Sequence, residues 1–447
     1  MGQTEQKKNG SLIAIITMFF IFAMISFVTN MAAPFGNIWG FKYEWAGMAG
    51  NLMNFTAYLF MGIPAGNMLI KFGYKKTALI ALAVGAIGLS IQLLSSVVGD
   101  NVVVIGGENP TTLNLFIYLL GALVCGFCVC MLNTVVNPML NLLGGGGNKG
   151  NQLIQTGGAL NSLSGTLTPM FVGVLVGTLT KETTMASVAP LVITGIAIFV
   201  LAFIVISFVK IKEPQANLGN VKYEHSPLSF RHCKLGVLAI FFYVGIEIGI
   251  PGEMNAWISR ESFEGAAAVA GSLAALYWLL MLVGRFLSSV ISGKVSTRTQ
   301  LLVASSVAII LTLIAIILPE DITFQSPQID ALNITSGEVP MKTLFLFLCG
   351  LCTSVMWGGI FNLATEGLGK YTAKASGIFM TMVVGGGIMP FIQDWIGRNV
   401  GYVSSYWLVF GMLVYIFYYA VIGSKNVNTD IPVEIENPAG SDLRDSL

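Results

Sequence analysis

Glu247 is the residue whose chemistry stands out, because it is a carboxylate in the middle of an apolar stretch, YVGIEIGIPGEMNAWI (243–258). At the centre of a membrane helix an ionisable group costs at least about 2.5 kcal/mol, so it persists where it faces a cavity or a partner. The glycines and proline of 249–252 predict a break in the helix just after it. A carboxylate at a helix break indicates a substrate or cation site. The alternative is a structural pair, for example with Arg285.

Amide side chains form a second set of candidates, spread over several apolar stretches. Asn133 and Asn137 in NTVVNP are four residues apart and share a helix face. An amide both donates and accepts hydrogen bonds, as a sugar hydroxyl does. The alternative for each amide is a hydrogen bond between helices. Without a strong anion clamp, the set favours a neutral polyhydroxyl solute, and the candidate ligands are Asn51, Asn133, Asn137, Gln155, Asn161 and Asn362, with Trp278 stacking on the ring.

The composition says which environment must position these groups. Of 447 residues, 55% are hydrophobic and only 10% are charged, against roughly 25% charged in a soluble domain. A protein that crosses the lipid bilayer many times is therefore expected. No basic tract indicates nucleic acid. The cysteines cluster in apolar segments without histidines nearby, so we expect them to pack helices and to bind no metal.

Twelve stretches are long enough to span a bilayer, which takes about 20 apolar residues. They are 12–32, 46–70, 77–98, 113–143, 152–178, 187–209, 235–259, 267–292, 300–318, 343–366, 373–395 and 402–423. In membrane proteins, Lys and Arg concentrate in the loops on the cytoplasmic side. With both termini inside, the outer loops hold only Lys42, Lys181, Arg260, Lys342 and Arg398 of the 23 Lys and Arg. We therefore expect an all-α membrane protein with both termini in the cytoplasm.

A charged segment between the sixth and seventh spans divides the chain into two halves. The expected parts are a six-helix half (1–210), a cytoplasmic linker (211–234), a second six-helix half (235–423) and a disordered tail (424–447). Two six-helix halves with a site between them are typical of a carrier that works by alternating access. No cofactor is expected beyond a co-transported H⁺ or Na⁺, and we expect a monomer.

Several motifs resemble the fucose and glucose/galactose permease family of the major facilitator superfamily. They are GIPAGNMLIKFGYK (62–75), NTVVNPMLNLLG (133–144), ALNSLSG (159–165), YVGIEIGI (243–250), IFNLATEGLG (360–369) and MTMVVGGGIMP (380–390). Members of that family are bacterial inner-membrane sugar transporters, and the fucose permeases are proton symporters. The resemblance implies the same fold and a sugar as the substrate.

The resemblance also assigns residues. Asn161 matches a sugar-binding asparagine and Asn51 a family glutamine, while Asn133 stands where fucose permeases have a glutamate of the coupling machinery. The family's other key carboxylate falls at Thr29 or Asn30, where this chain is neutral. The fucose-type pair is thus absent. Residues that match the family's inner-loop gate motif are Gly66, Lys71, Gly73 and Lys75.

Three mechanisms remain open from the sequence. Glu247 is the coupling carboxylate, or Na⁺ binds near Glu247, or the protein is a uniporter. An amino sugar or a muropeptide would also suit the amides. A sensor that binds sugar without transporting it would need a soluble output domain, for which the linker and tail are too short. An enzyme is excluded, because no nucleophile, base and orienting group can be assembled.

Overall fold

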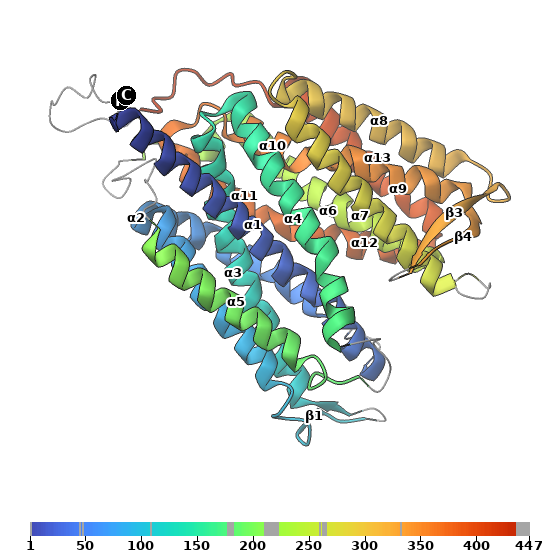
Figure 1. Cartoon of the computed structure of the whole chain (residues 1–447). Helices are drawn as coiled ribbons and strands as arrows, with labels where there is room; N and C mark the ends of the chain where they lie inside the picture. Colours follow the sequence, from blue (N-terminus) through green and yellow to red (C-terminus); the bar gives the residue numbers. More distant parts are fainter. Residues whose placement is uncertain are drawn as a thin grey trace.

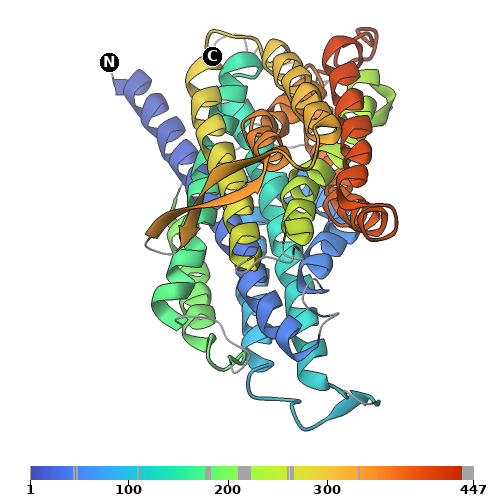
Figure 2. The ribbon, with the colours of Figure 1, turned by 90° about the vertical axis from the view of Figure 1, so that its right-hand side faces the viewer.

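The computed structural model describes residues 2–43, 46, 49–107, 110–176, 183–209, 223–258, 261, 266–330 and 333–434 (Figure 1). Long apolar helices dominate it, as lipid requires every backbone polar group to be satisfied within the segment. Seen from two directions, the helices form two bundles that correspond to the first and second halves of the chain (Figures 1 and 2).

The described residues of the first half contain α1 (Gly2–Lys42), α2 (Ala49–Leu94), α3 (Leu113–Leu143), α4 (Gly147–Val176) and α5 (Ala189–Phe208). The long α2 is two helices joined at Gly73, whose backbone has φ of 80° and ψ of 178°. A side chain at that φ is strained, so glycine allows the sharp change of direction between the expected second and third spans.

The second half contains α6 (Arg231–Ile258), α7 (Ala266–Ile291), α8 (Thr297–Ile317), α9 (Met341–Thr353), α10 (Met356–Thr365), α11 (Thr372–Thr381), α12 (Gly385–Asn399) and α13 (Tyr402–Tyr418). The expected tenth span is interrupted between α9 and α10. The eleventh is interrupted by a 3₁₀ turn at Met382–Val384, just before the glycine run. The break expected after Glu247 is wrong, because α6 continues through Pro251.

Ten helices of the described residues are long and apolar enough to cross a membrane, with α2 counted once. If α2 is counted as two spans and the less apolar α4 is added, the number of spans is consistent with the twelve expected from the sequence. Short 3₁₀ turns at Pro227–Ser229 and Gly369–Tyr371 and a π-helical turn at Tyr419–Gly423 lie at helix ends.

Two β-hairpins mark one end of the molecule. Strands β1 (Val103–Ile105) and β2 (Thr111–Thr112) pair in the first half. Strands β3 (Thr323–Asp330) and β4 (Asn333–Pro340) pair antiparallel in the second half, from Thr323 opposite Pro340 to Asp330 opposite Asn333. We call this end the hairpin face. The opposite end, where α1 begins, is called the termini face (Figure 1).

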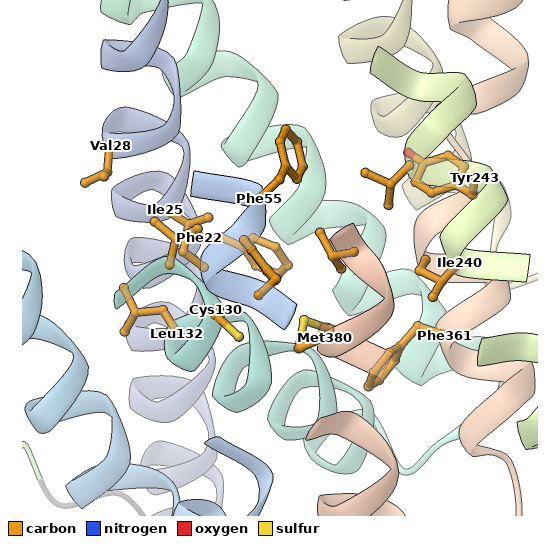
Figure 3. Packing of buried hydrophobic residues seen from close by; sticks show 14 of the residues in the cluster. Phe22, Ile25, Val28, Phe55, Cys130, Leu132, Ile240, Tyr243, Phe361 and Met380 are labelled. Atoms are coloured by element: carbon orange, nitrogen blue, oxygen red, sulfur yellow. The ribbon is translucent and has the colours of Figure 1, made fainter. Parts of the chain in front are cut away.

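The halves pack closely where glycines face each other. A Cβ added at Gly66 of α2 would lie 2.9 Å from the Cα of Gly377 in α11, and one at Gly62 would collide with Thr381. Figure 3 shows buried side chains around this junction, with Phe22, Phe55 and Cys130 from the first half and Ile240, Tyr243, Phe361 and Met380 from the second. Small residues thus bring the two bundles into backbone contact.

The first part of the tail lies against the termini face. The backbone N–H of Lys370 donates to the carbonyl of Val433 at 3.0 Å, and that of Arg231 donates to Asn428 Oδ1 at 2.8 Å. The remaining tail, 435–447, and most of the linker, 210–222, are outside the described residues. The division into halves, linker and tail stays a prediction.

Candidate functional site

The centre of the site is an ion pair between Glu247 of α6 and Arg285 of α7. Nη2 of Arg285 lies 2.9 Å from Glu247 Oε1, and the two side chains are only 11% and 12% exposed. Nη1 of the same guanidinium donates to the carbonyl of Gly158 at 3.2 Å and to Ser162 Oγ at 2.8 Å. Gly158 and Ser162 belong to α4, so Arg285 connects the two halves. The structural pair that the sequence left open is therefore present.

Three tyrosines surround this pair. Tyr243 precedes Glu247 by one helical turn and lies close to both charges, and its buried hydroxyl has no hydrogen-bond partner among the described residues. Tyr277 shares a hydrogen bond of 2.8 Å with Thr353 Oγ1. Tyr58 of α2 comes from the other half and is within electrostatic range of Glu247. The tyrosines thus lie on helices α2, α6 and α7 beside a pair whose charges compensate each other.

Asn133 and Asn137 begin a chain of hydrogen bonds that leads across the halves. Asn133 Nδ2 donates to the Tyr58 hydroxyl at 3.0 Å. Asn137 Nδ2 donates to the backbone carbonyl of Asn133 at 2.9 Å, and Asn137 Oδ1 accepts the indole N–H of Trp357 at 3.0 Å. The ring of Trp357 packs at 58° to that of Tyr243, with centroids 6.2 Å apart. Asn137 is fully buried by these contacts, while Asn133 is 7% exposed.

The other candidate ligands differ in burial and in the groups that they contact. Asn161 of α4 is half-buried, and its Nδ2 donates to the carbonyl of Phe22 at 2.9 Å. Asn51 is half-buried, and Thr29 is exposed with its hydroxyl donating to Ile25 within α1. The side chain of Asn30 lies outside the described residues. Trp278 is 37% exposed and packs edge-on against Tyr277.

Two predicted sugar ligands take part in contacts between the halves near the termini face, and their role as sugar ligands stays a prediction. Gln155 Nε2 donates to the carbonyl of Val355 at 3.0 Å. Asn362 Nδ2 donates to the carbonyl of Gly147 and to Thr297 Oγ1, both at 3.1 Å. Similar hydrogen bonds join Asn141 to Thr365, Asn151 to Ser292, Thr156 to Ser289 and Ser376 to the carbonyl of Thr134. We call this set the polar latch.

The gate motif has a different kind of contact. Gly66 faces Gly377 of the other half, and Gly73 makes the turn described above. Lys75 Nζ donates to the carbonyls of Ser207 at 2.8 Å and Val209 at 2.7 Å, at the end of α5. A cation at a helix C-terminus is favourable. Lys71 is exposed and lies 5.4 Å above the ring of Phe72.

A separate groove of about 500 Å³ lies between α1 and α4. Its lining is apolar apart from Ser164, so it does not suit a sugar; it is formed by Ile16, Phe19, Phe20, Ala23, Phe27, Leu160, Leu163, Ser164 and Leu167. No group of three or more metal-ligating side chains occurs in the described residues.

Sequence reasoning missed Tyr58 and Tyr243. A tyrosine four residues before an intramembrane carboxylate was a readable signal, because residues at i and i+4 meet on a helix. Tyr58 had no comparable signal, since it reaches Asn133 from a different helix.

A sequence model of the Major Facilitator Superfamily matches residues 13–390. A glucose/galactose transporter of Brucella abortus is 27% identical over 95% of this chain and 96% of its own. A putative glucose/galactose transporter of Helicobacter pylori is 27% identical over 87% and 89%. The solved Escherichia coli fucose:proton symporter has a TM-score of 0.72 at 19% identity, over 91% of this chain and 98% of its own. The resemblance seen in the motifs is confirmed.

Proposed function

The chain belongs to the Major Facilitator Superfamily, and we propose that it carries a neutral hexose, such as glucose or galactose, across the inner (cytoplasmic) membrane by alternating access. It is a multi-pass transporter and not an enzyme. The proposal draws on the names of the relatives, which are glucose/galactose transporters. The monomer and the cytoplasmic position of the termini remain expectations.

The observation that carries the choice of a neutral sugar is the balance of charge and hydrogen bonding at the centre. The buried charges there, Glu247 and Arg285, neutralise each other at 2.9 Å. The remaining polar groups are hydroxyls and amides, which match sugar hydroxyls as both donors and acceptors. In this proposal the sugar binds next to Tyr243 and Asn133, and Trp357, whose ring packs against that of Tyr243, offers a ring face beside them.

The contacts between the halves indicate how access alternates. On the side of the central site that faces the termini, the polar latch joins the halves with neutral hydrogen bonds, each worth about 0.5–1.5 kcal/mol. Contacts of this strength stabilise the closed conformation but can break when the halves move. When a sugar binds between the halves, its new contacts offset the loss of the latch, and the halves rock to open the termini face.

Transport is ion-coupled in this proposal, and Glu247 takes up the ion. The guanidinium 2.9 Å away occupies the place where a metal cation would need to approach Glu247. A proton needs no coordination shell, so H⁺ fits this carboxylate better than Na⁺. The rival outcome is a uniporter, which the neutral residues Asn133 and Thr29 favour because they replace the carboxylates of the related proton symporters.

Uptake of labelled hexoses into proteoliposomes tests the proposal. The purified protein is given a proton gradient, a Na⁺ gradient or neither, with glucose, galactose and fucose in parallel. We expect accumulation of a hexose above equilibrium with the proton gradient alone. Asn133→Ala should raise the KM for that sugar about tenfold or more, because the sugar loses a hydrogen bond in a desolvated site. The matched control is Asn399→Ala, since Asn399 is exposed and bonds only within α12.

Flux of no hexose under any condition, with counterflow also absent, would contradict the proposal and favour an amino sugar or a muropeptide. Equilibration without accumulation would support the proposal that the protein carries a hexose and contradict the proposal that transport is coupled to an ion. An Asn133→Ala variant that behaves like the Asn399→Ala control would show that the site lies elsewhere.

A further inference from the structure

We propose that Arg285 is the coupling residue of the transporter: it makes proton binding at Glu247 depend on whether the two halves are in contact. This inference rests on the proposed function, because it explains how an ion gradient drives the conformational change. It assigns a role to the side chain of Ser162 and the carbonyl of Gly158 as well, both of which accept hydrogen bonds from Arg285.

The first step is that the guanidinium of Arg285 donates hydrogen bonds to groups in both halves. Nη2 binds the carboxylate of Glu247 in the second half, and Nη1 binds Gly158 O and Ser162 Oγ in the first half. Arg285 and Glu247 are only 11% and 12% exposed, so water replaces these partners poorly. Arginine suits this position because its planar fork donates in several directions and it stays protonated.

The second step concerns what protonation of Glu247 does to Arg285. A neutral Glu247 leaves a buried cation without its counter-charge, which is costly. While the halves touch, the oxygens of Gly158 and Ser162 still accept from Nη1 and stabilise that cation. When the halves separate at the termini face, these acceptors are lost, and Arg285 needs an ionised Glu247. Proton binding at Glu247 is thus favoured when the termini face is closed.

Linkage then makes the effect reciprocal. If the closed termini face favours proton binding, a bound proton favours the closed termini face by the same free energy. The proton enters from the hairpin side while Arg285 is held by α4, and it leaves on the termini side after the latch opens. The other titratable groups that act on the pair are Tyr58, Tyr243 and Tyr277, from α2, α6 and α7. Glu247 is the carboxyl group at this position, and it is the group to which the inference assigns the proton.

The test measures the termini-face distance against pH without sugar. Spin labels are placed at Lys149 and Lys294, which are exposed on opposite halves, and the described cysteines are all buried and so protected from labelling. The distance is measured by double electron–electron resonance in nanodiscs between about pH 5 and pH 9. We expect a short distance at low pH and a growing long-distance population as the pH rises.

Variants make the test specific. Glu247→Gln should hold the short distance at every pH. Ser162→Ala should move the midpoint down by up to about one pH unit, because the neutral state of Glu247 loses one acceptor for Arg285. Ser164→Ala is the matched control, since Ser164 is two residues further along α4 and bonds to Ala23 within its own half. Its midpoint should equal that of the wild type.

A pH-dependent distance that persists in Glu247→Gln would overturn the inference, as would a Ser162→Ala midpoint equal to that of Ser164→Ala or a wild type indifferent to pH. Hexose uptake is measured in parallel on the same preparations. If hexose uptake fails while the distance still responds to pH, the proposed substrate is wrong and the role of Arg285 stands. If hexose uptake is normal and the distance does not respond to pH, the proposed role of Arg285 is wrong and the substrate stands.

Discussion

The termini face and the hairpin face of this protein are held in different ways. At the termini face and the centre, hydrogen bonds join the halves, from Asn141 with Thr365 to Arg285 with Ser162. At the hairpin face, each hairpin pairs within its own half, β1 with β2 and β3 with β4. The structure therefore represents the state that is closed at the termini face, which is the outward-facing state if the termini are cytoplasmic. Because the closed side depends on neutral amides and one shared arginine, it can open.

The largest expected effect is at the ion pair. Arg285→Met leaves Glu247 buried without its partner and should lower the free energy of unfolding by about 3–5 kcal/mol. The double variant Arg285→Met/Glu247→Gln removes both charges and should recover most of that loss, while proton-driven accumulation stays absent. Thermal denaturation in detergent and sugar uptake measure the two effects. A double variant as unstable as the single one would mean that Arg285 acts through packing.

The second effect concerns close packing at the gate motif. A methyl group at Gly66 would lie 2.9 Å from Gly377 Cα and 3.2 Å from the carbonyl of Ala373. Gly66→Ala should therefore disfavour the state closed at the termini face by about 1–3 kcal/mol, as overpacking does. Gly411→Ala is the control, because nothing lies within 4 Å of its added methyl. Increased labelling of a cysteine at the termini face measures the shift, and equal labelling in both variants would refute it.

A smaller effect is expected in the polar latch. Gln155→Leu removes the hydrogen bond to Val355 and should shift the equilibrium toward the open termini face by about 1 kcal/mol. Its measured signature is faster labelling at the termini face with an unchanged affinity for sugar. Gln92→Leu is matched to it, since Gln92 is a buried amide that contacts Cys125 within one half. If Gln155→Leu instead weakened sugar binding and left labelling alone, Gln155 would be a sugar ligand as the sequence predicted.

The smallest effect is expected at the hairpin face. Lys42 Nζ lies 2.8 Å from Asp100 Oδ1, and both side chains are well exposed, at 42% and 72%. The hydrogen bond and charge of Lys42 lower the pKa of Asp100. The pair therefore stabilises the fold above the ordinary aspartate pKa of about 3.9, and this contribution is lost as the pH falls through the lowered pKa. Asp100→Asn should cost less than about 1 kcal/mol at pH 7, and a larger loss of thermal stability would show a structural role.

The same comparison shows how far the sequence predicts such a molecule. Span lengths and the position of Glu247 inside a span follow from local composition, because lipid imposes length and polarity on each helix separately. The partners that Arg285, Gln155 and Asn362 have in the other half do not follow, since each of those partners lies more than a hundred residues away. An asparagine that binds sugar and one that closes a gate have the same side chain, and only the packing of the halves separates them. The expected break at Pro251 failed because a proline can remain inside a helix whose neighbours satisfy the freed carbonyl.

Distances across both faces, measured on one protein with and without sugar, test the central claim most directly. One pair of spin labels at Lys149 and Lys294 reports on the termini face, and a second pair at Asn101 and Asp321, both exposed, reports on the hairpin face. With saturating glucose or galactose, we predict a longer distance at the termini face and a shorter one at the hairpin face in the same fraction of molecules. Distances that stay constant, or that change in the same direction, would contradict alternating access around the site formed by Glu247 and Arg285.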